Sequence, residues 1–385
     1  MKINKNRMVE QMENLAQFGN HQEMGITRFA FTQEYEEARC YVKKCMEEAG
    51  LETHIDAVGN LIGVYMGNKR GKIFVGSHID TVKCGGKYDG SIGVIGAIEA
   101  VRTLHENQIR LEKDIYVCAY VDEEFTSLGS KAIAGAKVEE DSIHKLILNG
   151  YQEEDVKKCR FELEQQDIAL ELHIEQGKML EEKNINIGIV DAIAASYKYA
   201  GVVKGTAGHA GTLQMYQRED AFVKMSEYTL AFNQMVCEYE QLVGTIGKIE
   251  VTPGARNIVP GKVDFLMEMR SPNEKDMLEV EKKLEEKFGD KVELIRTEEY
   301  KIVEMDVEIN QKIEKICKDM NMSFMHMNSG AGHDIQSFNE RAKCGLIFIP
   351  SVGGLSHCPE EYTSWEDCER GINVLMHLIR KAGEE

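Results

Sequence analysis

The residues best suited to chemistry lie in one glycine-rich segment, Gly-Ser-His-Ile-Asp-Thr-Val-Lys-Cys-Gly-Gly-Lys-Tyr-Asp-Gly at 76–90. His78 and Asp80 end a predicted buried strand, and Asp89 precedes a predicted apolar helix. Imidazole and carboxylate groups together suit divalent ions such as zinc, manganese or cobalt. We expect Asp80 to support the His78 ring, and the loop glycines to let Asp89 reach the same ion. The alternative is that His-x-Asp makes only a hydrogen bond within the loop.

Three further segments place acids or histidines at the ends of predicted strands. They are Tyr-Val-Asp-Glu-Glu at 120–124, Glu-Leu-His-Ile-Glu-Gln-Gly at 171–177 and Gly-Gly-Leu-Ser-His at 353–357. Acids packed at a buried strand end repel one another unless a cation or a proton lies among them, so Glu123 and Glu124 favour a bound cation. His173 and His357 add imidazoles. His333 is the alternative ligand to His357; we favour His357, with His333 behind the ligands.

The composition excludes several classes of function. The 385-residue chain is long enough for two or three domains, and its net charge of −19 argues against nucleic acid or an anionic membrane as a partner. No apolar run reaches the roughly 18 residues that a membrane span needs, and the polar N-terminus lacks a secretory signal. Ten scattered cysteines without a Cys-x-x-Cys pair predict reduced thiols. These features favour a cytoplasmic enzyme.

The elements that must position the candidate ligands alternate between strand and helix. Predicted strands lie at 60–65, 72–78, 115–121 and 168–174, with a helix at 92–104; near the other end follow helix 308–320, strand 346–350 and helix 365–381. This alternation predicts an α/β fold with a mainly parallel sheet covered by helices. The active site of such a sheet lies beyond the carboxyl ends of its strands, where the candidate ligands fall. The charged stretch 139–166 is predicted to be a solvated helical excursion.

Between residues 197 and 305 the pattern changes to that of an inserted domain. The predicted order is strand 198–204, helix 219–240, strands 242–250 and 262–270, a second helix, and strand 291–297. This β-α-β-β-α-β order is the ferredoxin-like α+β arrangement. Ser271 is expected to cap the second helix, with Pro272 in its first turn. We therefore expect a metal-binding catalytic domain, residues 1–196 plus 306–385, and an inserted dimerisation or lid domain, residues 197–305.

Taken together, the motifs resemble the M20 metallopeptidase-like superfamily. More narrowly, they resemble its amidase/hydantoinase/carbamoylase branch of N-carbamoyl-L-amino-acid hydrolases, allantoate amidohydrolases and β-ureidopropionases. Besides the segments above, the resemblance includes Gly-Ile-Thr-Arg-Phe-Ala-Phe-Thr at 25–32, Val-Gly-Asn-Leu-Ile-Gly at 58–63, Asn-Ile-Val-Pro-Gly at 257–261, Ser-Gly-Ala-Gly-His-Asp at 329–334 and Ser-His-Cys-Pro-Glu at 356–360. Ordinary M20 peptidases usually carry a carboxylate where His173 stands, which makes that segment specific to the branch.

The resemblance implies a centre of two divalent ions per subunit, zinc, manganese, cobalt or nickel. By position, His78 and His173 would hold one ion, Glu124 and His357 the other, and Asp89 would bridge them. Asp80 and His333 would lie in the surrounding shell. Glu123 would be the general acid/base.

The resemblance also implies a substrate and a partner. The substrate would be a small ureido or carbamoyl compound with a carboxylate, contacted by Gln176, His209, Asn257 and Arg270. His209 would also stabilise the oxyanion, and the inserted domain would form a homodimer that places His209 and Asn257 at the partner's site. Two plainer alternatives remain: His209 caps the following helix, and Arg270 forms a surface ion pair with Asp264 or Glu268.

Three segments depart from the family pattern and leave the substrate open. Phe-Thr-Ser-Leu follows Glu124, Leu-Gln-Met occupies 213–215, and Glu-Met precedes Arg270. Our leading hypothesis is a binuclear-metal hydrolase of linear N-carbamoyl amides, foremost N-carbamoyl-L-amino acids. Allantoate or another ureido compound is the rival substrate. An M20-type aminopeptidase or deacylase is disfavoured by His173, and a non-catalytic metal-stabilised binding protein is disfavoured by the intact Glu123.

Overall fold

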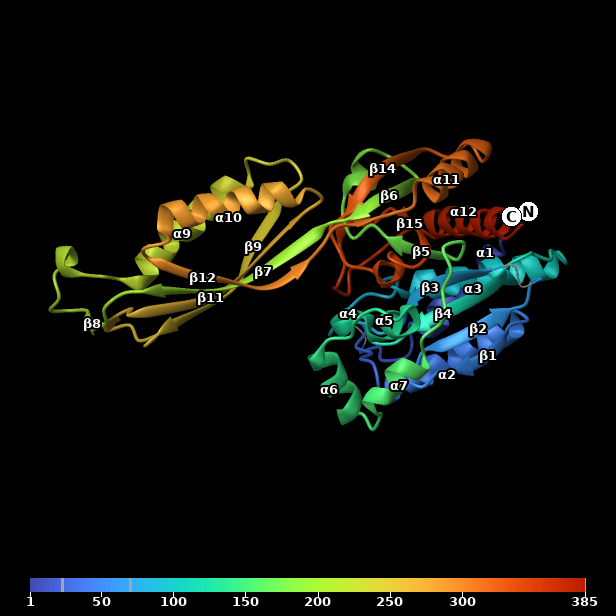
Figure 1. Cartoon of the computed structure of the whole chain (residues 1–385), viewed down its shortest axis with the longest axis horizontal. Helices are drawn as coiled ribbons and strands as arrows, with labels where there is room; N and C mark the ends of the chain where they lie inside the picture. Colours follow the sequence, from blue (N-terminus) through green and yellow to red (C-terminus); the bar gives the residue numbers. More distant parts are fainter. Residues whose placement is uncertain (22–23, 69–70, 385) are drawn as a thin grey trace. The chain divides into compact units, whose positions relative to one another are not determined.

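The computed structural model describes residues 1–21, 24–68 and 71–384 (Figure 1). The chain divides into two compact units. Unit 1 consists of Met1–Asp191 and Glu304–Glu385, and unit 2 consists of Ala192–Val303. The catalytic role of unit 1 and the dimerisation or lid role of unit 2 stay predictions.

The centre of unit 1 is a parallel sheet. Its middle strands are β4 (Asp114–Tyr120), β3 (Lys72–His78), β5 (Ile168–Ile174) and β15 (Lys343–Ile349), all parallel to one another in that spatial order. Every residue of β5 is buried, as expected for a strand covered on both faces. On the flanks, β2 (Leu61–Tyr65) and β6 (Ile187–Ile193) pair antiparallel to β4 and β15. The predicted α/β class with a mainly parallel sheet is confirmed.

Helices cover this sheet and give unit 1 its core. The main ones are α1 (Lys5–Leu15), α2 (Gln33–Glu48), α3 (Ser91–Glu106), α11 (Val307–Asp319) and α12 (Trp365–Gly383). Helix α3 is buried along nearly its whole length, which fits its apolar sequence. The predicted excursion between 139 and 166 forms two short helices, α6 (Glu140–Leu148) and α7 (Glu153–Lys158).

Unit 2 has the predicted ferredoxin-like order. Its elements are β7 (Ala195–Lys204), α9 (Ala221–Val236), β9 (Val243–Thr252), β11 (Lys262–Ser271), α10 (Glu274–Phe288) and β12 (Val292–Tyr300). The sheet order is β12-β7-β11-β9, and each neighbouring pair is antiparallel. Along β11 the side chains alternate between buried and accessible, so Phe265, Met267 and Met269 join the core formed with α9 and α10.

The start of helix α10 differs from the prediction. Asn273, not Ser271, is the N-cap, and its side chain accepts a hydrogen bond from Lys275 N–H at 3.3 Å. Pro272 therefore precedes the cap and lies outside the first turn. The reason is that β11 continues to pair with β7 as far as Ser271, opposite Ala195. The side chain of Ser271 accepts the N–H of Asn273 at 3.0 Å, which supports the turn between strand and helix.

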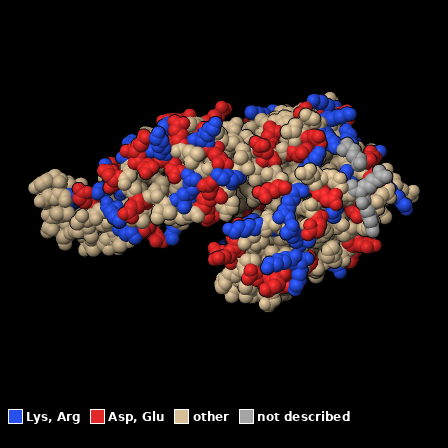
Figure 2. Space-filling model, viewed as in Figure 1, with Lys and Arg blue, Asp and Glu red and all other residues tan. Residues whose placement is uncertain are grey.

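The charged side chains on the surface and the state of the cysteines are consistent with the composition of the chain. Acidic and basic side chains are interspersed on the face shown in Figure 2. All ten cysteines lie in the described ranges and are free thiols. Among the described residues, no helix is both long enough and apolar enough to cross a bilayer.

Candidate metal centre

The candidate ligands meet around one carboxylate, that of Asp89. Because β3, β4 and β5 are parallel, their carboxyl ends lie at one edge of the sheet, where His78 and His173 stand. The Nε2 atoms of these two histidines lie 3.7 and 3.0 Å from Asp89 Oδ1. His357 Nε2 lies 3.1 Å from Asp89 Oδ2 and 3.4 Å from Glu124 Oε2.

The two oxygens of Asp89 therefore face two different groups of side chains. Atoms of His78, Asp89 and His173 lie within 4.8 Å of one another, and so do atoms of Asp89, Glu124 and His357. The first group is buried, whereas the side chain of His357 is 50% exposed and opens the second group to solvent. Oxygen and imidazole nitrogen ligands in these numbers suit zinc or manganese. The assignment of each side chain to an ion stays a prediction, and this geometry fits it.

The charges of the buried acids provide a test of whether a cation fits. Burial raises the pKa of Glu123 well above its ordinary value, and burial raises that of Glu124 to about 7. Burial also raises the pKa of Asp89, but hydrogen bonds with His173, His357 and His78 outweigh it and hold that pKa well below the usual range. Without a cation, burial therefore disfavours the charged form of both glutamates. A divalent cation would supply the missing positive charge, so the residues fit a metal.

Glycine is required at two points of the ligand loop. Gly90 has φ +62°, and a Cβ there would lie 2.4 Å from the ring of His78. The N–H of Gly90 also points at His173 Nε2, at 3.2 Å. A Cβ at Gly86 would lie 2.2 Å from the carboxylate of Glu361. The loop can thus double back against the strand ends only because these positions lack side chains.

Asp80 makes contacts other than the predicted one. Its main-chain carbonyl, not its carboxylate, lies 3.0 Å from Nδ1 of His78, and the nearest carboxylate oxygen is 3.8 Å away. The carboxylate instead accepts the N–H groups of Glu123 and Glu124, at 3.4 and 3.2 Å. These amides begin the short helix α4 (Glu123–Thr126), whose first N–H groups have no partner within the helix. Asp80 therefore holds the two glutamates in place, and its carboxylate faces His78 at ion-pair distance without a hydrogen bond, so its support of that ring stays a prediction.

His333 lies behind the centre. It is buried, its ring centroid is 4.6 Å from that of His173, and its Nε2 lies 2.9 Å from Ser329 Oγ. Burial lowers its pKa well below the ordinary value, which keeps the ring neutral. Potential ligand atoms of His333 lie within 4.8 Å of those of Glu171 and His173. The histidine that lies beside Glu124 is His357.

Sequence reasoning missed two buried acids that support the centre. Glu361 accepts the N–H groups of Tyr88 and Asp89 at 2.9 and 3.1 Å. Because these partners are 273 and 272 positions away, respectively, no local spacing could reveal them. Glu171 accepts the hydroxyl of Ser77 at 2.7 Å. It shares a face of β5 with His173 two residues later, and this period-two spacing is a signal that could have identified it.

Gln176 joins the centre through one end of its side chain. Its Nε2 donates to Asp89 Oδ2 at 3.0 Å and to Ser356 Oγ at 3.2 Å. The carboxylate fixes the amide orientation, since only the NH₂ end can donate to it. The Oε1 atom is buried and has no hydrogen-bond partner among the residues that the structure describes. A buried acceptor without a donor is costly, so this atom is ready to accept a ligand N–H.

Two of the candidate substrate residues in unit 2 lie together. His209 belongs to β8 (Gly208–His209), which pairs antiparallel with β10 (Ile258–Val259), and Ala210 N–H donates to the carbonyl of Asn257 at 3.0 Å. Both His209 and Asn257 are exposed. Asp220 caps helix α9, so the alternative that His209 is the cap is excluded.

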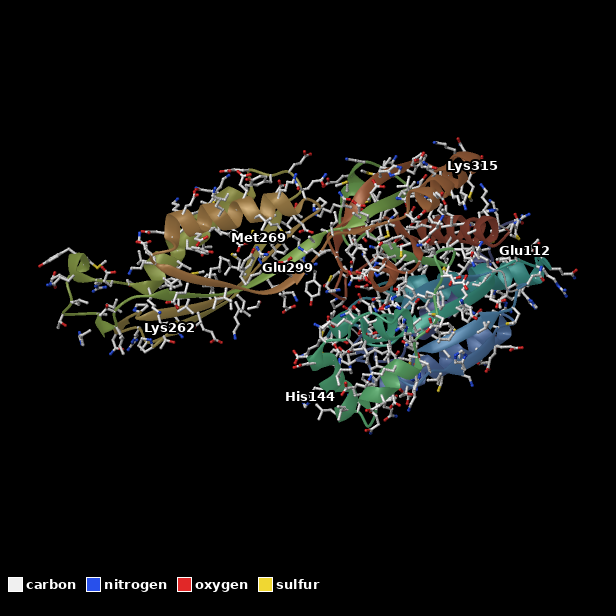
Figure 3. All side chains as sticks on the ribbon, in the orientation of Figure 1. Glu112, His144, Lys262, Met269, Glu299 and Lys315 are labelled. Carbon is white, nitrogen blue, oxygen red and sulfur yellow. The ribbon has the colours of Figure 1, made fainter. Side chains whose placement is uncertain are left out.

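Arg270 lies at the other end of the same sheet. Its Nε and one terminal nitrogen each lie 2.9 Å from Glu268 Oε1, so the plainer alternative of an ion pair is present, whereas Asp264 pairs with Lys262. Arg270 pairs with Ser196 at the start of β7, and Lys262 pairs with Lys204 at its end, next to the His209 loop. Eight residues of strand span roughly 26 Å. Lys262 and Met269, labelled in Figure 3, mark these two ends. Unit 2 therefore does not bring Arg270 together with His209.

Comparison with known proteins gives the family. Residues 74–381 match peptidase family M20/M25/M40. The chain belongs to this family. The M20 relatives include an allantoate amidohydrolase of Bacillus subtilis (strain 168), 34% identical over 98% of this chain and 97% of its own length. An N-carbamoyl-L-amino-acid amidohydrolase of Pseudomonas sp. (strain NS671) is 33% identical over 98% of both chains.

Other M20 relatives place the chain within the family. The ureidoglycolate hydrolase of Arabidopsis thaliana is 33% identical over 96% of this chain and 85% of its own. A solved amidase of the hydantoinase/carbamoylase family from Burkholderia multivorans has a TM-score of 0.88 and 26% identity, covering 100% of this chain and 99% of its own. The predicted branch is therefore confirmed, and the chain is an M20 amidohydrolase. These relatives differ in substrate, so the branch alone does not fix the one that this chain takes.

Proposed function

We propose that this M20 chain is a binuclear-metal amidohydrolase that cleaves a linear N-carbamoyl amide, foremost that of an N-carbamoyl-L-amino acid. The observation that carries the proposal is the position of Asp89 between two ligand groups, with the acid of Glu123 beside them. The named activities of the relatives support it, because each acts on a small carbamoyl or ureido compound. Net charge and free thiols support a cytoplasmic location.

The proposed roles follow from position and charge. His78 and His173 would hold one divalent ion, Glu124 and His357 the other, and Asp89 both. The ions would lower the pKa of a bound water and stabilise negative charge on the carbamoyl oxygen. Glu123 Oε2 lies 3.5 Å from His78 Nε2. Because burial raises the pKa of Glu123, its carboxylate can take a proton from the attacking water and return it to the leaving nitrogen.

The substrate would be recognised by one buried acceptor of unit 1 and by side chains of unit 2. Gln176 Oε1 is a buried acceptor that a ureido N–H would satisfy. Arg270 offers a planar fork that suits the substrate carboxylate, in competition with Glu268. His209 would stabilise the oxyanion and Asn257 would contact the substrate.

A homodimer is part of the proposal. Within unit 2 the distance along β11 keeps Arg270 away from His209 and Asn257, and a substrate of this size cannot span roughly 26 Å. If all of these residues contact one substrate, they must come from two copies of the chain. The inserted unit is the element through which the copies would associate.

Allantoate and ureidoglycolate are the rival substrates, since relatives of similar identity are named for them. The experiment is to remove metal with a chelator, restore zinc, manganese, cobalt or nickel in turn, and measure ammonia released from carbamoyl and ureido compounds and free amino acid released from dipeptides. N-carbamoyl-L-amino acids, allantoate, ureidoglycolate and dipeptides are compared. We expect metal-dependent turnover that is fastest with a carbamoyl amino acid. Cleavage of dipeptides without any ureido hydrolysis would instead identify an aminopeptidase and contradict the proposal.

A further inference from the structure

Arg28 is a buried cation whose role the proposed function does not explain. It lies in the segment 25–32 and is 1% exposed. In the described part of the chain, its hydrogen bonds go to carbonyl and hydroxyl oxygens, and none goes to a carboxylate. Burial lowers the pKa of Arg28 to about 10, partly opposed by the nearby charge of Asp80, so the side chain stays charged at neutral pH. A buried charge without an ion-pair partner is costly and calls for a specific reason.

The guanidinium of Arg28 contacts the chain beside two candidate ligands, His78 and Asp89. Its Nε donates to the carbonyl of Ile79, between His78 and Asp80, at 2.6 Å. One terminal nitrogen lies 3.3 Å from the hydroxyl of Ser91, two residues after Asp89. The same side chain therefore touches the backbone beside one ligand and the helix start beside another.

Two further sets of contacts anchor Arg28 itself. Its second terminal nitrogen donates to the carbonyls of Leu15 and Phe18, both at 2.9 Å. Its backbone N–H donates to Thr81 Oγ1 at 2.9 Å, and its carbonyl accepts the N–H of Thr81 at 3.1 Å. Since α1 ends at Leu15, the guanidinium is held against a helix end that does not belong to the ligand loop.

We propose that Arg28 is a positioning residue of the metal centre, which fixes the spacing between His78 and Asp89 before an ion binds. The inference rests on the proposed binuclear centre. Its physical reason is that a planar guanidinium has donors in fixed directions, so three groups of acceptors attached to it cannot shift independently. Groups that orient ligands in this way strengthen metal binding without touching the ion.

The alternative is that Arg28 acts only through its charge, which balances the buried acids. Arg28→Lys separates the two, because lysine keeps the charge and loses the planar fork. Arg28→Met removes both. Arg39→Lys is the matched control: Arg39 is 8% exposed and donates to the carbonyl of Gly59 at 2.9 Å, and its described contacts do not include residues 78–91.

The experiment measures zinc affinity of the full-length chain by competition with a chromophoric chelator, together with kcat and KM. We expect Arg28→Lys and Arg28→Met to bind zinc about 10- to 100-fold more weakly, and Arg39→Lys to stay within about threefold of wild type. At limiting zinc, kcat should fall, excess zinc should restore it, and KM should not change. If the Arg28 substitutions lowered only the stability of the fold, the zinc affinity of the variants would equal that of wild type.

The outcomes distinguish this inference from the proposed function. If wild type binds two ions and Arg28→Lys binds them equally well, the positioning role is wrong and the proposed function stands. If wild type binds none, the proposed function and the inference both fail. If the Arg28 variants do not fold, Ser91→Ala decides, because it removes one contact of the guanidinium: we expect zinc affinity about fivefold weaker, and unchanged affinity would overturn the inference.

Discussion

Units 1 and 2 present their candidate functional side chains in opposite ways. In unit 1, His78, Asp89 and His173 are buried, and the histidine nitrogens lie within 3.0–3.7 Å of the carboxylate. In unit 2, His209 and Asn257 are exposed, and an ion pair occupies Arg270. The proposed metal centre is therefore organised by one unit, whereas the proposed substrate contacts need something outside unit 2 to bring them together.

The largest expected effect concerns Glu123, the acid beside the buried group. Glu123→Gln should retain two metal ions per subunit and lose turnover by roughly 10²- to 10⁴-fold, because the amide cannot carry the proton. Metal content and kcat measured on the same sample test this. Glu99→Gln is the matched control, since Glu99 is fully buried and accepts the N–H of Asn4 at 2.8 Å, away from the ligands. Undiminished turnover in Glu123→Gln would remove this residue from the reaction.

The next largest effect compares Asp89, which would bind both ions, with His357, which would bind only one. Asp89→Asn should reduce the occupancy of both ions, because each oxygen of Asp89 faces a different ligand group. His357→Ala should reduce the occupancy of one ion and leave the buried group loaded. Metal analysis after dialysis against a weak chelator gives the stoichiometry. Equal losses in the two variants would mean that Asp89 does not bridge.

The exposed residues of unit 2 can be tested by complementation. His209→Ala and Arg270→Ala should each be nearly inactive alone. If one site takes these residues from two copies, mixed dimers contain one complete site, and coexpression of the variants should restore about a quarter of wild-type activity. Coexpressing His209→Ala with a second, differently tagged His209→Ala is the control. Activity that stays at the level of that control would mean that both residues serve one site from one chain.

The smallest effect is a pH dependence outside the centre. A hydrogen bond with Asp191 raises the pKa of His326, Glu314 adds to this, and partial burial opposes it. A raised folded-state pKa stabilises the fold below the unfolded pKa of about 6.5, and this contribution is lost as the pH rises through the folded value. His326→Gln should therefore lower the unfolding midpoint more at pH 6 than at pH 9. The side chain is 39% exposed, so the difference should be small. Equal shifts at both pH values would contradict it.

The sequence predicted most of what lies within one element and little of what connects distant ones. Segments rich in apolar residues marked β3 and β5, and glycines around Asp89 marked the ligand loop. The hydrogen bonds of the Asp80 carboxylate were not predicted, because they go to amides more than 40 positions away. Glu361 went unnoticed for the same reason.

The start of helix α10, near Ser271, shows a second limit of prediction from the sequence. Serine followed by proline is a good local signal for a helix start, and β-sheet pairing with Ala195 overrode it. Local patterns therefore predicted which elements form, and tertiary pairing decided where this one begins.

Anomalous X-ray diffraction from crystals of the full-length chain grown with zinc tests the central claim most directly. The account predicts two anomalous peaks about 3.5–4 Å apart, each beside a different oxygen of Asp89, one near His78 and His173 and the other near Glu124 and His357. A single peak, or peaks remote from Asp89, would contradict it.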